Sequence, residues 1–186
     1  MVETKQRPRV SEGFILASLL YLTGMLISFL IPSQSYPKEL GRTLFPHSLN
    51  EHYDLRGLLL MNWSAILVLS LGYVTFGALT ALSLNFNGMI VGSILREILK
   101  ENLRGTLFCF LLHGPLEIVS VLISSSVGLS SAVTVIHGEN PYDISRDNLI
   151  YLVKLVLLSL IIVTISSIIE FYLSIPCILV SLNGHT

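Results

Sequence analysis

The chain has 186 residues, of which 52% are hydrophobic and 12% are charged, and its formal net charge at pH 7 is −1. Soluble domains carry about 25% charged residues, so this composition excludes an ordinary water-soluble domain and predicts an integral membrane protein. The near-neutral charge also excludes the basic surface that nucleic acid binding requires.

The first apolar stretch runs for 18 residues from Phe14 to Ile31 and follows Lys5, Arg7 and Arg9. It is longer than the roughly 7–15 residues of a signal-peptide core, and no A-x-A-like cleavage site follows it. The sequence therefore predicts a retained transmembrane helix. Pro32 should end this helix, because proline lacks a backbone donor and biases its predecessor away from helix.

A polar connection from residue 33 to residue 57 separates this helix from three long apolar stretches. The stretches cover roughly residues 58–95, 106–136 and 149–182. Each exceeds the about 20 residues that cross a bilayer. We therefore expect one all-α transmembrane domain over residues 1–186, a polytopic bundle of about four to six membrane segments.

Each long stretch contains a polar interruption. The interruptions are "NFNG" (residues 85–88), "HGPLE" (residues 113–117), and Glu170 with Pro176 beyond it. Such interruptions predict broken or re-entrant helices, since Asn, Gly and Pro are poor residues for a helix interior.

Positive charge near the membrane ends predicts the orientation. The N-terminal segment 1–12 and the amphipathic segment "REILKENLR" (96–104) are basic, so we expect both in the cytoplasm. The connection 33–57 and the acidic loop 137–148 should then lie outside. With this threading, helix rise places all three interruptions in the inner half of the membrane.

The segment "HGPLE" predicts that one helix stops and another starts. Gly114 before Pro115 disfavours continuation, while proline is favoured at a first helical position. Glu117 then lies in a first turn, where the helix dipole favours a carboxylate, and His113 in the last turn of the preceding helix.

Ionisable residues at membrane depth are functional candidates, because they are costly unless they face a cavity or a partner. We therefore predict a functional polar cluster. Its members are Asn87, His113, Glu117 and Glu170. The structural alternative, in which His113 and Glu117 only satisfy each other and tie helices together, stays open.

The sequence predicts neither a metal nor a cofactor. A His-x-x-x-Glu pair supplies two ligands, whereas zinc sites need three or four, and His137 should lie on the opposite side. No catalytic residue is assigned; His113 and Glu117 are the candidates if the protein is an enzyme. Cys109 and Cys177 lie in apolar runs and are expected to be buried as small hydrophobes, without a disulfide.

Small residues predict close helix packing. Gly88 and Gly92 have GxxxG spacing, Gly24 and Ser28 have the related small-xxx-small spacing, and Gly128 lies in "SSSVGLSS". The full set of predicted break and packing residues is Gly88, Gly92, Gly114, Pro115, Gly128 and Pro176.

In their order along the chain, "NFNGMIVG", "LLHGPLEIVSVLISSSVGL" and "IIEFYLSIP" resemble the stage II sporulation protein M family over about two thirds of the sequence. The matching positions are Asn87, Gly88, Gly92, His113, Gly114, Glu117, Glu170 and Pro176. Leu112 stands where the family pattern has proline, Pro115 is unusual after the glycine, and the spacing from Glu170 to Pro176 is one residue longer than in the pattern.

The resemblance implies a multi-pass cell-membrane protein that works with partners. Short relatives are linked with export, maturation or self-immunity of bacteriocins, often beside an ABC transporter, and other members with septal wall remodelling during sporulation. We expect a non-enzymatic subunit with a cytoplasmic N-terminus. Its expected partners are membrane lipid, other membrane subunits such as an ABC transporter ATPase and permease, a peptide substrate and a second copy of the chain, but no nucleic acid.

Other functions remain open. One is an intramembrane hydrolase or peptide-processing enzyme that uses His113 or Glu117 as a general base. Another is an ion or proton pathway through His113, Glu117 and Glu170. A third is a scaffold for cell-wall remodelling in sporulation, as the resemblance implies. The sequence has no P-loop, so an ATP-driven step would need another subunit.

Overall fold

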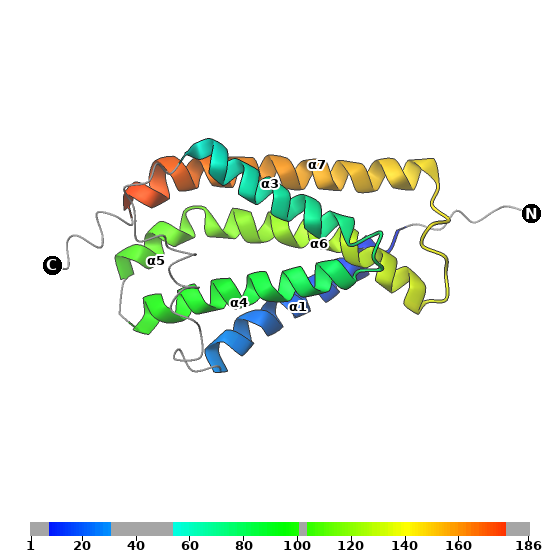
Figure 1. The fold of residues 1–186 in the computed structure, drawn as a ribbon, viewed down its shortest axis with the longest axis horizontal. Helices are drawn as coiled ribbons and strands as arrows, with labels where there is room; N and C mark the ends of the chain where they lie inside the picture. The colour runs from blue at the N-terminus through cyan, green and yellow to red at the C-terminus, as the bar shows by residue number, and fades with distance from the viewer. Residues whose placement is uncertain (1–7, 31–53, 101–103, 178–186) are drawn as a thin grey trace, which may run out of the picture.

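The computed structural model describes residues 8–30, 54–100 and 104–177, and this part of the chain is all-helical, as predicted. Its elements are α1 (Val10–Leu30), α3 (Leu55–Leu71), α4 (Ala78–Lys100), α5 (Arg104–Leu111), α6 (Gly114–Ile136), α7 (Arg146–Ile169) and the π-helical segment η2 (Glu170–Ser174). The long helices run back and forth along the long axis of the molecule (Figure 1).

Helix α6 is the centre of the bundle. It contacts α1, α3, α4 and α7, and 61% of its most apolar stretch is buried, against 22–28% in the other long helices. The serine-rich sequence of α6 explains this position, because small side chains let several neighbouring backbones approach at once.

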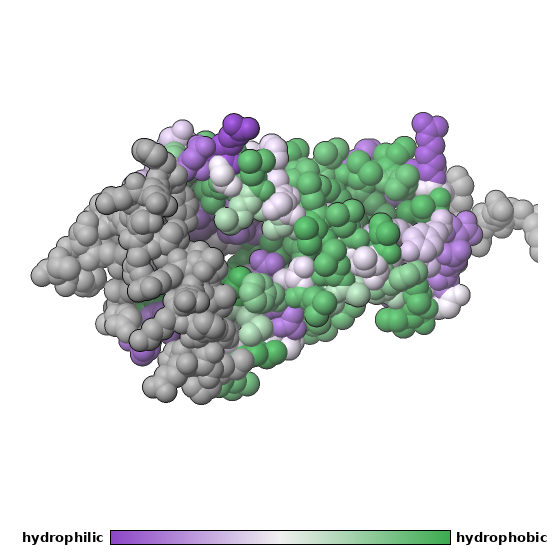
Figure 2. Space-filling view, in the orientation of Figure 1, coloured by the Kyte–Doolittle hydropathy of each residue, from purple (hydrophilic) through white to green (hydrophobic). Residues whose placement is uncertain are grey.

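The outside of the bundle suits lipid. Among the described residues, four helices are long and apolar enough to span a membrane, namely α1, α4, α6 and the helix from Arg146 to Cys177, while α3 is apolar but shorter. Large apolar side chains point outward, including Leu30, Leu82 and Ile136, which are 74–82% exposed. Apolar residues cover most of the middle of the visible face (Figure 2). This is a multi-pass membrane protein.

Glycines lie at the contact between α1 and α4. A Cβ atom on Gly88 would overlap the carbonyl oxygen of Tyr21, and one on Gly92 would overlap the Ser28 hydroxyl. Gly24 faces the carbonyl oxygen of Asn85 in the same way. The two helices are therefore packed backbone to backbone through the small residues that the sequence pattern singles out.

The predicted break at residues 85–88 is wrong. Helix α4 runs through this segment, and the Asn87 amide donates to the carbonyl oxygen of Ser83, 2.8 Å away, within the helix. The chain turns earlier, between residues 72 and 77, where Phe76 and Gly77 have φ values of 49° and 77°. Gly88 of "NFNG" serves packing against α1, and the sequence alone does not distinguish a glycine at a helix contact from a glycine at a turn.

The predicted orientation is wrong in one respect, because it places the start of the first helix and the loop 137–148 on opposite sides of the membrane. Arg9 donates to Glu139 at 3.0 Å, so the N-terminal segment and the loop after α6 lie at the same end of the bundle. Tyr142 also donates to the carbonyl oxygen of Val74 at 3.1 Å. The turn before α4 therefore shares this end.

Residues 96–100 lie at the opposite end, because α4 crosses the bundle before it reaches them. Residues 96–100 are the last turns of α4, not a separate interfacial helix. Arg96 donates to the carbonyl oxygen of Ser28 at 2.6 Å, which anchors this end of α4 to α1. Residues 8–12 and 96–100, the described parts of the two basic segments, therefore lie at opposite ends of the bundle, so the prediction that both segments share a side of the membrane is wrong. The connection 33–57 lies outside the described residues except for its last four.

Candidate functional site

The break between α5 and α6 lies where "HGPLE" predicts it. α5 ends at Leu111 and α6 begins at Gly114, with Pro115 in its first turn. Proline is tolerated there because its missing N–H has no intrahelical partner in that turn. His113 occupies the N-cap position of α6, and its carbonyl oxygen accepts from the backbone N–H of Glu117 at 3.2 Å.

Glu170 does not break its helix. It begins η2, a π-helical turn, and the helix then continues through Pro176 to Cys177. Proline in a helix interior removes one hydrogen bond and clashes with the preceding turn. The wider turn just before Pro176 explains how the helix passes it without stopping, since π-turns commonly absorb such irregularities.

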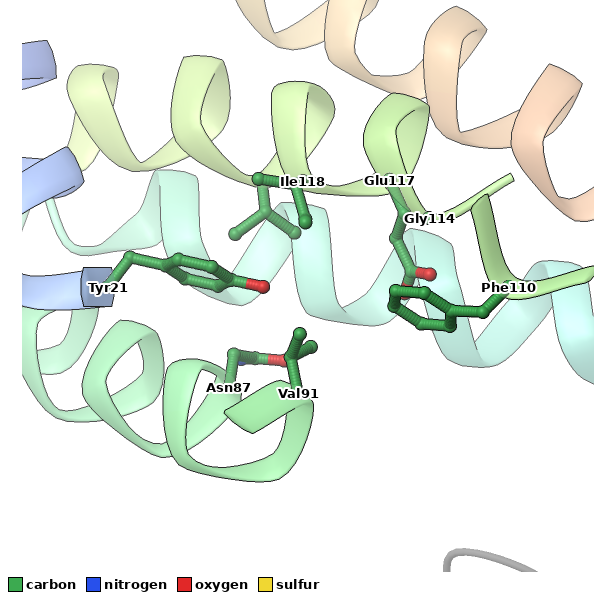
Figure 3. A pocket seen from close by; sticks show the side chains of 8 residues that line it. Tyr21, Asn87, Val91, Phe110, Gly114, Glu117 and Ile118 are labelled. Atoms are coloured by element: carbon green, nitrogen blue, oxygen red, sulfur yellow. The ribbon is translucent and has the colours of Figure 1, made fainter. Parts of the chain in front are cut away.

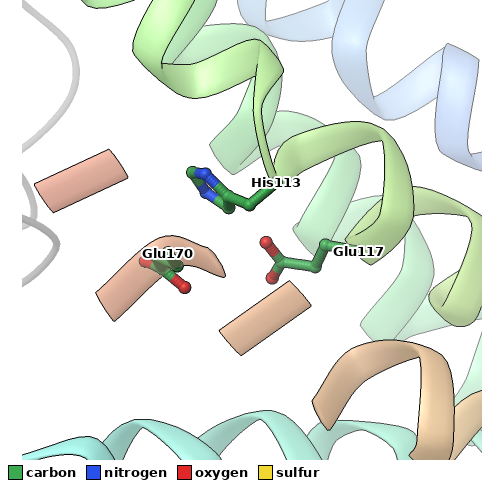
Figure 4. Close-up of side chains that lie close together, drawn as sticks. All are labelled: His113, Glu117 and Glu170. Atoms are coloured by element: carbon green, nitrogen blue, oxygen red, sulfur yellow. The ribbon is translucent and has the colours of Figure 1, made fainter. Parts of the chain in front are cut away.

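The break and the π-turn bring three ionisable side chains together. One ligand atom each from His113, Glu117 and Glu170 lies within 4.8 Å of the other two. Figure 4 shows the imidazole and the two carboxylates converging from the start of α6 and from η2. His113 is only 5% exposed, and the two glutamates are partly buried.

Two serines hold the histidine in place. Nδ1 of His113 lies 2.8 Å from the hydroxyl of Ser174, which comes from η2. The hydroxyl of Ser166 donates to the carbonyl oxygen of His113 at 3.0 Å. Phe110 packs edge-on against the imidazole, with ring centroids 5.6 Å apart. Both the backbone and the ring of His113 are therefore fixed by neighbouring elements.

The cluster has no basic partner within the described residues. Neither Glu117 nor Glu170 forms an ion pair there with Lys or Arg. Two carboxylates this close inside a membrane bundle are unfavourable unless a proton or a cation compensates their charge.

A small cavity adjoins the cluster. Its lining residues are Tyr21, Asn87, Val91, Phe110, Gly114, Glu117, Ile118 and Val121. Figure 3 shows Tyr21, Asn87 and Glu117 entering this space from α1, α4 and α6. Asn87 therefore shares a cavity with Glu117 but is not one of the three clustered ligands. Glu117 belongs to the cluster and also lines the cavity, so it is the residue that connects the two.

Sequence reasoning misses three residues of this site. Ser174 and Ser166 carry only a weak signal, namely a hydroxyl-rich stretch around Glu170 in "TISSIIEFYLS". Tyr21 is one aromatic residue in an apolar helix and gives no signal at all. Their roles depend on which helices are neighbours, which one helix's own sequence does not reveal.

The expectation of two separate cysteines is also wrong. Cys109 in α5 and Cys177 at the end of the described chain form a disulfide, with Cα atoms 5.7 Å apart. Cys109 is buried, as expected. The two residues meet because α5 packs against η2. This pairing joins the segment before the break to the segment after the π-turn.

Comparison with known proteins supplies a family. The chain matches the family described as "Stage II sporulation protein M" over residues 17–175, which include the break, the cluster and the π-turn. It is 27% identical over 165 residues to "Uncharacterized protein MJ0793" of Methanocaldococcus jannaschii, a match that covers 86% of this chain and 92% of that protein. No solved structure matches. The chain belongs to the stage II sporulation protein M family.

Proposed function

We propose that this chain is a non-enzymatic subunit of a membrane complex that exports, matures or gives immunity to a bacteriocin-like peptide. One observation carries the proposal: an ionisable centre of His113, Glu117 and Glu170, with a cavity beside it, inside a membrane bundle. Broken helices with polar groups at the break form binding sites in several transporter folds. Such a centre is suited to engage a peptide segment or a partner helix.

Two features of the chain support dependence on partners. Residues 8–30, 54–100 and 104–177 form helices and short turns. The sequence also lacks a P-loop. We therefore propose that an ATPase and a permease of ABC transporter type, or a peptide-maturation enzyme, supply the energy or the chemistry.

We propose that the N-terminus faces the cytoplasm. Lys5, Arg7 and Arg9 precede the first span, which commonly dominates orientation. The disulfide between Cys109 and Cys177 lies toward the opposite end, and disulfides persist on the oxidising side of a membrane. In this orientation the polar centre lies in the outer half of the membrane. This replaces the inner-half placement, which required segments 1–12 and 96–104 to share a side.

Labelling of single cysteines tests the orientation. In a background with both native cysteines replaced by serine, Asp143→Cys and Arg56→Cys place thiols at exposed positions near opposite ends of the bundle. A membrane-impermeant maleimide should label Arg56→Cys in intact cells and Asp143→Cys only after permeabilisation. The reverse pattern would place the N-terminus outside.

A gene deletion with complementation tests the function. We expect deletion to reduce the secretion of a bacteriocin-like peptide by the host cell, or the resistance of the cell to that peptide, and the wild-type gene to restore it. Glu117→Gln should fail to restore the activity, whereas Glu97→Gln, at an exposed carboxylate of α4, should restore it. Both variants must reach the membrane at wild-type levels. If both restore the activity, the cluster has only a structural role; if deletion instead blocks engulfment, the protein is a scaffold for wall remodelling.

A second candidate function is an intramembrane hydrolase or peptide-processing enzyme. The observation that favours it is the double placement of Glu117, which lies in the cluster and also lines the cavity. A carboxylate beside a space for water and substrate is suited to general-base catalysis. Incubation of the purified protein with a candidate bacteriocin precursor peptide, followed by mass spectrometry, separates the two functions, because the subunit hypothesis predicts an intact peptide and the enzyme hypothesis a cleaved one.

A further inference from the structure

We propose that His113, Glu117 and Glu170 bind a divalent transition-metal ion such as Zn²⁺ or Mn²⁺. The proposal stands whether or not the chain works in a peptide-export complex, because it concerns the occupant of the cluster and not its partners.

The first argument is geometric. Three ligand atoms from three side chains lie within 4.8 Å of one another. In tetrahedral geometry, bonds of about 2.0–2.2 Å to one ion place two ligand atoms about 3.3–3.6 Å apart. The most distant pair therefore needs to close by about 1.2–1.5 Å at most, which rotation of the two glutamate side chains can supply.

The second argument is the donor set. Imidazole and carboxylate together suit Zn, Fe and Mn, whereas Mg and Ca prefer sites made of oxygen alone. Three protein ligands are also the number found in catalytic zinc sites, which leave one position for water or substrate. The cavity between Tyr21, Asn87 and Glu117 provides space on one side of the cluster for such a ligand.

The third argument is the support behind the histidine. Nδ1 of His113 is occupied by the hydroxyl of Ser174 at 2.8 Å, which leaves Nε2 as the metal-binding nitrogen. Metal-binding histidines usually engage their second ring nitrogen in a hydrogen bond, and the contact with Ser174 fixes the orientation of the ring. Ser166 also holds the backbone carbonyl at the break, so the ligand cannot move with a flexible turn.

The fourth argument is charge. The two carboxylates have no ion pair with a Lys or Arg in the described part of the chain, although they are close together at membrane depth. A divalent cation would compensate both charges at once. The two departures from regular α-helix, the break before Gly114 and the π-turn from Glu170, lie on either side of this point. π-Turns occur frequently at functional sites.

The experiment measures metal on the purified, membrane-extracted full chain. The protein is stripped with a chelator, loaded with Zn²⁺ or Mn²⁺, freed of excess metal and analysed for metal per chain. We expect about one ion per chain for the wild type and a loss of it in Glu170→Gln, Glu117→Gln and His113→Gln. Glu97→Gln, at an exposed carboxylate of α4, and His137→Gln, at the opposite end of the bundle, are matched controls that should keep the ion.

Two further measurements separate loss of binding from loss of fold. Zn²⁺ should raise the unfolding temperature of the wild type and of Glu97→Gln but not that of Glu170→Gln, and all three should elute alike in gel filtration. Co²⁺ should give visible ligand-field absorption that His113→Gln alters. Ser174→Ala keeps all three ligands and should weaken the affinity by about 10–100-fold. No ion above background in the loaded wild type, or equal binding by Glu170→Gln, would overturn the proposal.

Discussion

Replacement of Gly128 by alanine tests whether the packing of α6 depends on the absence of a side chain. A Cβ atom at this position would overlap the carbonyl oxygen of Leu69 and the hydroxyl of Thr80. Neither atom can yield easily, because the Thr80 hydroxyl is buried and donates to that same carbonyl oxygen at 2.7 Å. Helix α6 must therefore move away from α3 and α4, or this hydrogen bond must break.

The magnitude follows from two opposing effects. Overpacking of this kind costs about 1–3 kcal/mol, and the better helix propensity of alanine returns about 0.5–1 kcal/mol. The matched control is Gly57→Ala in α3, where a Cβ atom would meet nothing within 4 Å, so only the propensity effect remains. The two variants should then differ in free energy of unfolding by about 1–3 kcal/mol.

Unfolding in mixed micelles with increasing SDS, followed by circular dichroism, measures this difference. Gly128→Ala should unfold at a lower SDS fraction than the wild type, and Gly57→Ala at the same or a higher fraction. If Gly128→Ala proves as resistant as Gly57→Ala, the close approach of α6 to α3 and α4 is not what stabilises the bundle.

Two other expectations concern the ends of the bundle. The hydrogen bond from Arg9 holds the pKa of Glu139 below its usual 4.5, so this pair stabilises the fold above pH 4.5, and the stabilisation is lost as the pH falls through the lowered pKa. Unfolding in SDS should therefore depend less on pH in this range in Glu139→Gln than in the wild type. The same pH profile in both proteins would contradict this role of the pair. Reduction of the disulfide between Cys109 and Cys177, which are 68 residues apart, should lower the free energy of unfolding in SDS by at most about 4 kcal/mol. The control is a Cys177→Ser variant, whose unfolding should not respond to reductant. Identical unfolding of the wild type with and without reductant would argue against the pairing.

Features decided by local backbone chemistry are visible in the sequence. The break before Gly114 is an example, because a glycine followed by proline disfavours one helix and starts another wherever the segment lies. The turn at residues 72–77 is less visible, since its interior carries apolar residues such as Val74 and Phe76. An apolar run in a membrane protein looks like a continuous span even where a turn interrupts it.

Features decided by helix neighbours are not visible. Gly88 can mark a break or a contact, and only the position of Tyr21 on α1 shows that it is a contact. The relative placement of the basic segments is hidden for a similar reason. Counting charges treats each segment separately, whereas the hydrogen bond from Arg9 to Glu139 shows that the start of α1 and the loop after α6 lie at the same end of the bundle. The convergence of Glu170 on His113 likewise depends on the packing of η2 against α5.

The π-turn has a consequence for how the chain could change by insertion or deletion. A π-turn accommodates one residue more than an α-turn, and the segment from Glu170 to Ser174 is such a turn. Deletion of a single residue from this turn would therefore restore regular helix and leave Cys177 facing Cys109, because the turn holds that residue as a local bulge. Deletion of a residue from the regular part of α7 would instead rotate everything beyond it by about 100° and carry Ser174 and Cys177 away from His113 and Cys109.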